Sequence, residues 1–147
     1  MAERIFNLDE AEKLLPRLEP LLRVAADGKR RITAIERESA RLLESIFLMG
    51  GRQVDVERFS QRKREKQQWS ERLGQAAQEI EDCGCLLKDL DMGLVDFPCR
   101  VGEREVYLCW KLGEPYIQYW HNLDEGFAGR KPIDATLSEE LKRSGPV

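Results

Sequence analysis

The chain has 147 residues, of which 41% are apolar and 35% charged, and its formal net charge is −3. This length and composition predict one folded domain that needs neither disulfides nor metals, and they exclude a disordered chain. The near-neutral charge argues against nucleic-acid binding, which relies on a basic surface. The chain shows no signal-peptide pattern and no apolar run of about 18 residues, which argues against a membrane partner and predicts a cytoplasmic protein.

The first half of the chain, residues 7–84, is predicted to be helical. A short helix is expected over residues 8–15, because Asn7 or Asp9 can cap it and Pro16 ends or kinks it. A long helix is expected over residues 17–49, where apolar and small side chains at heptad spacing favour a coiled-coil-like seam along a partner: Ala25, Gly28, Ile32, Ile35, Ser39, Leu42, Ile46 and Met49. Two glycines then break this helix, and a second one is expected over residues 55–82. The two helices should form an antiparallel hairpin about 40 Å long.

A basic cluster interrupts the apolar stripe of the second helix. Arg62 and Lys66 stand between Phe59 and Trp69, at positions where a buried stripe would be apolar. The segment 61–66 is either a solvated helix face or a surface for a partner, which could be a second copy of the chain or an acidic molecule. The tip of the hairpin is therefore poorly suited to burial within one small monomer. The sequence favours a homodimer formed through the hairpin.

After Gly84 the apolar pattern changes to period 2, which predicts a three-stranded antiparallel meander and loop over residues 85–135. A turn at Gly102 and Glu103 should pair Phe97 with Leu108. A second turn at Gly113 and Glu114 should pair Val106 with His121. This register collects one apolar face that packs on the helices: Val95, Phe97, Cys99, Val106, Leu108, Trp110, Ile117, Tyr119 and His121. The opposite face holds polar and aromatic residues and is either solvated or covered by a segment or partner: Asp96, Pro98, Arg100, Glu105, Tyr107, Cys109, Lys111, Tyr116, Gln118 and Trp120.

The only histidine, His121, is predicted at the end of the third strand, facing the helices. It is either a structural residue or part of a pocket where the loop 121–130 meets the helices. The imidazole can supply acid–base chemistry or bind a metal, carboxylates can complete the set, and arginine can hold an anion. The catalytic candidates are His121, Glu125 and Asp96, the ligand-binding candidates Arg130, Glu114 and His121, and the metal candidates His121 and Glu125. A divalent metal is allowed as a cofactor but not required, and whether the chain is an enzyme stays open.

Two further patterns argue against common metal sites. The four cysteines should be reduced thiols, and the C-x-C spacing of the first two differs from that of zinc sites: Cys83, Cys85, Cys99 and Cys109. Asp89, Asp91 and Gly93 share a spacing with calcium loops, but the remaining ligands are missing. Finally, Thr136 and Glu139 predict a capping box for a short helix over residues 137–143.

The strings GCLLKDLDMGLVDFP, LCWKLGE, YWH and EGFAGRKPI resemble a bacterial family known as domain of unknown function 2203, and the resemblance covers nearly the whole chain. It implies a ferritin-like helical core and no established reaction. Di-iron chemistry is not expected, because the helical half contains no histidine. The sequence therefore predicts an α+β protein that acts as an interaction or assembly module. The alternative is a small enzyme that uses a metal or an anionic ligand around His121.

Overall fold

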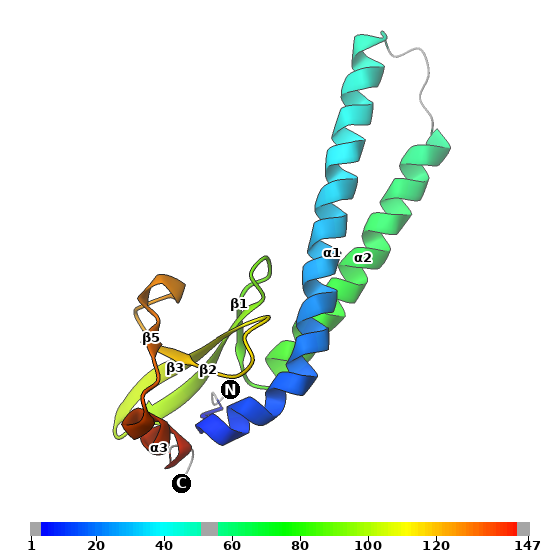
Figure 1. Cartoon of the computed structure of the whole chain (residues 1–147). Coiled ribbons are helices and arrows are strands. Elements are labelled where there is room, and N and C mark those ends of the chain that lie inside the picture. Colours follow the sequence, from blue (N-terminus) through cyan, green and yellow to red (C-terminus); the bar gives the residue numbers. More distant parts are fainter. Residues whose placement is uncertain (1–3, 51–55, 144–147) are drawn as a thin grey trace.

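A computed structural model of the chain describes residues 4–50 and 56–143. The first helix, α1, runs unbroken from Leu8 to Leu48 and contains both Pro16 and Pro20. The prediction of two separate helices over 8–15 and 17–49 is therefore wrong. The prolines bend the helix, so that its first turns lie at an angle to the rest in Figure 1. The Asn7 side chain caps the helix by accepting a hydrogen bond of 2.8 Å from the backbone N–H of Glu10.

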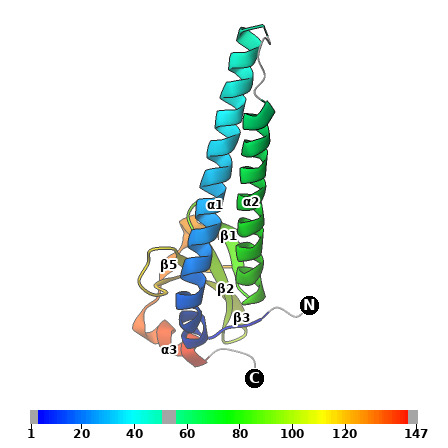
Figure 2. The same ribbon diagram turned by 90° about the vertical axis from the view of Figure 1, so that its right-hand side faces the viewer.

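The second helix, α2, spans Val56–Asp82 and runs antiparallel beside α1, so the predicted hairpin is present (Figures 1 and 2). The helices approach each other closely at Gly28, where an added Cβ would lie 3.3 Å from Cβ of Leu73. Burial along the seam fades with distance from the sheet: Ile35 is buried, Ile46 is half-buried and Met49 is 69% exposed. A coiled coil along the full length of the hairpin is thus not confirmed.

The basic cluster of α2 contributes to the contact between the two helices. Arg62 forms an ion pair with Glu38 of α1, and Lys66 forms one with Glu36 at 3.1 Å. These pairs occupy the positions where the apolar stripe is interrupted. The segment 61–66 has four basic side chains, Arg62, Lys63, Arg64 and Lys66. Because Arg62 and Lys66 are neutralised across the hairpin, the segment offers less free positive charge than its sequence indicates.

The sheet has five antiparallel strands in the order β1-β2-β3-β4-β5, which corrects the prediction of three. The strands are β1 (Leu86–Asp89), β2 (Leu94–Val101), β3 (Arg104–Lys111), β4 (Tyr119–Asn122) and β5 (Lys131–Pro132). Strand β1 begins four residues after the end of α2, and β5 has only two residues, so neither gives a period-2 pattern long enough to recognise.

The predicted register is confirmed for β2 and β3, where Val101 pairs with Arg104 and Phe97 pairs with Leu108. The register predicted for β3 and β4 is wrong by one residue, because His121 pairs with Tyr107 and not with Val106. The reversal after β3 is closed by a hydrogen bond from the Glu114 N–H to the Lys111 carbonyl. It is therefore centred one residue earlier than predicted, and Pro115, which has no N–H for a ladder, follows it.

The register error changes which side chains share a face. His121 lies with Tyr107 and Cys109 on the outer face, the side of the sheet that points away from α1 and α2, while Trp120 takes its place on the inner face opposite Leu108. The inner face packs on the first half of α1 and the end of α2 to form the core: Phe6, Leu15, Leu18, Leu22, Ile80, Val95, Phe97, Cys99, Val106, Leu108 and Trp110.

A short 3-10 helix, η1 (Phe127–Gly129), and the helix α3 (Ala135–Arg143) complete the described chain. Helix α3 begins two residues before the predicted start, and Asp134 caps it by accepting a hydrogen bond from the Leu137 N–H at 2.7 Å. The capping box of Thr136 and Glu139 is therefore not the start of this helix.

Within residues 4–50 and 56–143, no helix has the length and apolar character needed to cross a membrane. The same residues form two long helices where a ferritin-like bundle has four, so that core is not confirmed.

Candidate functional site

Three adjacent strands bring Asp96, Cys109 and His121 together on the outer face. Asp96 of β2 pairs directly with Cys109 of β3, and His121 of β4 lies one diagonal step away. One ligand atom from each side chain lies within 4.8 Å of the other two. Asp96 and His121 are each 2% exposed and Cys109 is fully buried. The three residues, which we call the outer-face cluster, are the one group in the described part of the chain with the composition of a metal site.

Both ring nitrogens of His121 have partners. Nδ1 lies 2.8 Å from the carbonyl oxygen of Asn122, and Nε2 lies 3.1 Å from Oδ1 of Asp96. A carbonyl oxygen can only accept a hydrogen bond, so Nδ1 carries a proton and donates it. The lone pair of a neutral imidazole then points from Nε2 towards a carboxylate oxygen, which is also an acceptor. A positive charge must sit between these two atoms, in the form of either a shared proton or a cation.

Cys109 lies between Asp96 and Arg130. Burial, followed by the negative charge of Asp96, raises the pKa of the Cys109 thiol to about 12, while Arg130 acts in the opposite direction. At neutral pH the thiol is therefore protonated and can donate to the Asp96 carboxylate. Since a thiolate is the reactive form of cysteine, this environment does not favour Cys109 as a nucleophile.

The segment that follows β4 folds back over the outer face. Arg130 places its guanidinium 4.1 Å from the ring centre of Tyr119 and 4.2 Å from that of Phe127. Its Nη1 donates to both carboxylate oxygens of Glu114, at 3.0 and 3.1 Å. A covering segment was one of the two possibilities for this face, and Arg130 and Phe127 provide it. Two of the three predicted ligand-binding residues, Arg130 and Glu114, are thus engaged with each other.

Glu125 has partners of its own. Its carboxylate accepts hydrogen bonds from the Asn122 side chain at 2.7 Å and from Lys131 at 2.6 Å. Lys131, together with the backbone N–H of Asn122, lowers the pKa of Glu125 to about 2. The carboxylate of Glu125 is thus engaged by Asn122 and Lys131, and the carboxylate that His121 contacts is that of Asp96.

The sequence predicts a pocket where the loop 121–130 meets the helices, and the hollow beside the start of α1 is lined by other residues. A hollow of about 470 Å³ lies beside the start of α1, and its lining comes from the segments around β4 and β5 and from α3: Leu8, Glu12, Tyr116, Ile117, Gln118, Tyr119, Pro132, Ile133, Asp134, Ala135 and Ser138. None of these residues is one of the predicted site residues. Burial and the nearby Asp9 raise the pKa of Glu12 above its usual value.

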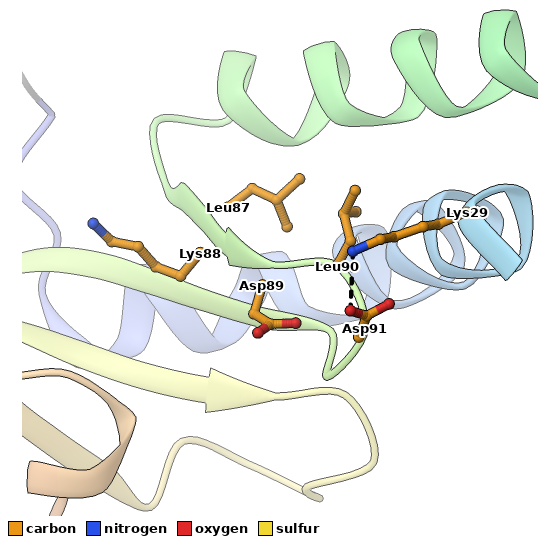
Figure 3. A pocket seen from close by; sticks show the side chains of 6 residues that line it. All are labelled: Lys29, Leu87, Lys88, Asp89, Leu90 and Asp91. Atoms are coloured by element: carbon orange, nitrogen blue, oxygen red, sulfur yellow. Dashed lines mark hydrogen bonds and ion pairs between the residues drawn. The ribbon is translucent and has the colours of Figure 1, made fainter. Parts of the chain in front are cut away.

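A second hollow, of about 320 Å³, lies where the turn after β1 meets α1 (Figure 3). The Lys29 ammonium of α1 reaches Oδ2 of Asp91 at 2.9 Å across it. Asp89 accepts a hydrogen bond from the Met92 N–H at 3.0 Å and so closes the turn. The acidic residues of this segment therefore hold the turn and tie the sheet to the hairpin.

Five of the nine exposed large apolar side chains in the described residues lie at the far end of the hairpin. Phe47 is 84% exposed, Leu48 78% and Val56 67%. A hollow of about 310 Å³ beside them is lined by Leu43, Val56, Phe59, Ser60 and Lys63. Figures 1 and 2 show that this end of α1 and α2 lies far from the sheet. We call the exposed residues Leu43, Phe47, Leu48, Met49 and Val56 the arm tip.

Sequence reasoning identified His121 and Asp96 but placed them on opposite faces, and it did not include Cys109 in a site. The sequence did contain evidence that Cys109 lies beside Asp96, because the register of the first hairpin pairs these two residues. What was missing was the register of β4, which determines whether His121 joins them.

These features define an α+β protein in which a two-helix arm projects from a five-stranded sheet with a closed polar cluster. Residues 4–133 match the family described as Uncharacterized conserved protein (DUF2203), and the chain belongs to that family. No curated protein and no solved structure matches the chain.

Proposed function

We propose that the protein is an assembly module that forms a homodimer through its arm tip. The observation that supports this proposal is the exposure of large apolar side chains where they cannot reach the core of their own chain, with Phe47 84% exposed. Burying apolar surface releases about 25 cal/mol per Å², so such a group of side chains favours association.

The tip suits a second copy of the same chain. In a twofold interface a protrusion on one copy meets a recess on the other, and the reverse contact forms as well. Phe47 is a protrusion of this kind, and the hollow lined by Leu43, Val56 and Phe59 is a recess of apolar character on the same tip. Two hairpins that exchange Phe47 in this way would pack four helices side by side.

The charges near the tip are mixed and partly paired, which favours this partner over an acidic one. Arg62 and Lys66 already bind Glu38 and Glu36 of the neighbouring helix. An isologous interface can place the acidic groups of one copy beside the basic groups of the other, whereas a nucleic acid requires a surplus of basic groups.

The alternative of a small enzyme around His121 has weaker support. His121, Asp96 and Cys109 are at most 2% exposed, so an organic substrate has no access to them in this conformation. The arginine beside them is paired with Glu114. A binding role through the arm tip needs no such opening.

The test is the mass of the protein in solution, measured by size-exclusion chromatography with light scattering over about a hundredfold range of concentration. We expect a dimer that dissociates on dilution. Phe47→Ser should raise the dimer Kd by about thirtyfold, which is the loss of about 2 kcal/mol typical of an interface hot spot. Its circular dichroism and thermal unfolding as a monomer should be unchanged, because Phe47 packs on no core residue.

Tyr116→Ser is the matched control, since Tyr116 is a 53% exposed aromatic residue at the sheet end of the molecule. This variant should remain a dimer with the same Kd. A wild-type protein that stays monomeric over the whole range, or a Phe47→Ser variant that dimerises as well as wild type, would refute the proposal.

A further inference from the structure

The outer-face cluster combines the three side-chain types that bind borderline transition metals. Asp96 offers a carboxylate oxygen, Cys109 a sulfur and His121 an imidazole nitrogen, all within 4.8 Å of one another. In zinc sites the ligands lie about 2.0–2.3 Å from the ion, so neighbouring ligand atoms are about 3–4 Å apart. The 3.1 Å between Nε2 of His121 and Oδ1 of Asp96 fits an ion that binds both.

The orientation of His121 is a second and independent observation. Metal-binding histidines donate their other ring N–H to a carbonyl or carboxylate, which fixes the tautomer and turns the free lone pair towards the ion. His121 does this with the Asn122 carbonyl at 2.8 Å, and Nε2 then faces the cluster. In the neutral imidazole and the ionised carboxylate, Nε2 and Oδ1 of Asp96 are two acceptors 3.1 Å apart, so either a proton or a metal ion must lie between them.

The surroundings also suit a thiolate ligand. Arg130 lies within hydrogen-bonding reach of the Cys109 sulfur and is held there by Glu114 and by the rings of Tyr119 and Phe127. When Cys109 and Asp96 are both ionised, a divalent ion balances their charge within a buried site. The second oxygen of Asp96 or one water molecule can complete a four-coordinate shell.

We propose that Asp96, Cys109 and His121 bind one divalent transition-metal ion, and that zinc is the ion this donor set fits best. The ion would join β2, β3 and β4 at the middle of the sheet. Because the cluster is closed, the ion serves to hold the strands together and is loaded as the chain folds. This site is independent of the arm tip and of dimerisation.

The alternative to a metal is a proton shared between His121 and Asp96, and cobalt distinguishes the two. The full-length protein is unfolded in chelator, freed of the chelator and refolded with or without Co²⁺. We expect one Co²⁺ per chain, with the near-ultraviolet absorption of a cobalt–thiolate bond and the visible bands of a tetrahedral site. Zn²⁺ added in equal amount should displace the cobalt and remove these bands.

Variants assign the ligands. Cys109→Ser should lose the thiolate absorption, whereas Cys99→Ser, which changes a fully buried cysteine on the inner face of the same sheet, should keep it. Asp96→Asn retains the shape of the side chain and should weaken Co²⁺ binding by at least about tenfold. The wild-type titration does not depend on whether a variant folds. Refolded wild-type protein that binds no stoichiometric Co²⁺, or absorption that persists in Cys109→Ser, would overturn the proposal.

Discussion

At the scale of single residues, the carboxylate of Glu125 connects the end of β4 to β5. It accepts from Lys131 and from the backbone and side chain of Asn122, and these bonds favour its charged form. The pKa of Glu125 falls from an ordinary value of 4.5 to about 2 for that reason. A carboxyl group whose pKa is lower in the folded state stabilises the fold above its unfolded pKa, and this stabilisation is lost as the pH falls towards the folded pKa.

We therefore expect Glu125→Gln to lower the urea midpoint of unfolding at pH 6, and we expect the difference from wild type to shrink between about pH 4.5 and pH 2. Urea titrations at several pH values in this range measure it. Glu139→Gln removes a carboxylate whose partner Arg143 is as exposed as Glu139 itself, so its midpoint should differ little from wild type at every pH. A difference for Glu125→Gln that is constant across the range would contradict this account.

The candidate site shows how far residue types alone can lead. The concentration of aromatic and titratable side chains in β2 to β4 points to the part of the chain that holds the outer-face cluster. The pairing of Asp96 with Cys109 followed from the turn at Gly102 and Glu103. The place of His121 could not be obtained in this way, because a shift of one residue moves a strand's side chains to the opposite face. Long-range contacts, such as that of Arg130 with Cys109, leave no mark in local sequence.

At the scale of elements, the second reversal explains the error. Gly113 and Glu114 have the composition of a two-residue turn, but the Glu114 side chain accepts from the Lys111 N–H at 2.7 Å and its carbonyl accepts from Trp110 Nε1 at 3.0 Å. These bonds turn Glu114 back towards β3, and pairing resumes only at Tyr119.

The helices are easier to predict, since their apolar periodicity extends over many turns. The sequence predicts a helix end or kink at Pro16, because it does not show that Leu15 and Leu18 are buried on either side of this proline.

The close approach of α1 and α2 at Gly28 gives a prediction at this scale. A side chain there would meet Cβ of Leu73 at 3.3 Å and the Trp69 carbonyl at 3.4 Å, whereas Gly74 has no neighbouring atom within 4 Å. Gly28→Leu should force the helices apart and lower the free energy of unfolding by about 1–3 kcal/mol. Gly74→Leu should raise it by about 0.5 kcal/mol, because leucine favours a helix more than glycine does.

Urea unfolding of both variants and wild type, at a concentration where the protein has one oligomeric state, gives these two changes with one protocol. The pair is matched because each variant replaces a helical glycine of the hairpin by the same residue. Equal effects of the two substitutions would mean that the contact at Gly28 does not hold the helices together.

At the scale of the whole molecule, burial is unevenly distributed. The sheet and the base of the arm share one core, while α2 buries only Ala76 and Ile80, both near its end at the sheet. Farther out, ion pairs such as that of Lys66 with Glu36 join the helices. Exposed or half-exposed ion pairs contribute little, about 0–1 kcal/mol each. A monomer should therefore open locally from the arm tip towards the sheet, with a free energy that rises along the arm.

Hydrogen exchange at two protein concentrations tests this gradient together with the proposed dimer. In dilute protein, amides of residues 40–48 and 56–64 should exchange faster than those of residues 22–35 and 74–80, and the strands β2 and β3 should exchange most slowly. At high concentration the tip segments should become protected, because dimerisation buries Phe47 and its neighbours. Phe47→Ser should keep the gradient and lose the concentration dependence. Uniform exchange along both helices in dilute protein would show instead that the arm opens as one unit, because its stability would then not follow the decline in burial towards the tip.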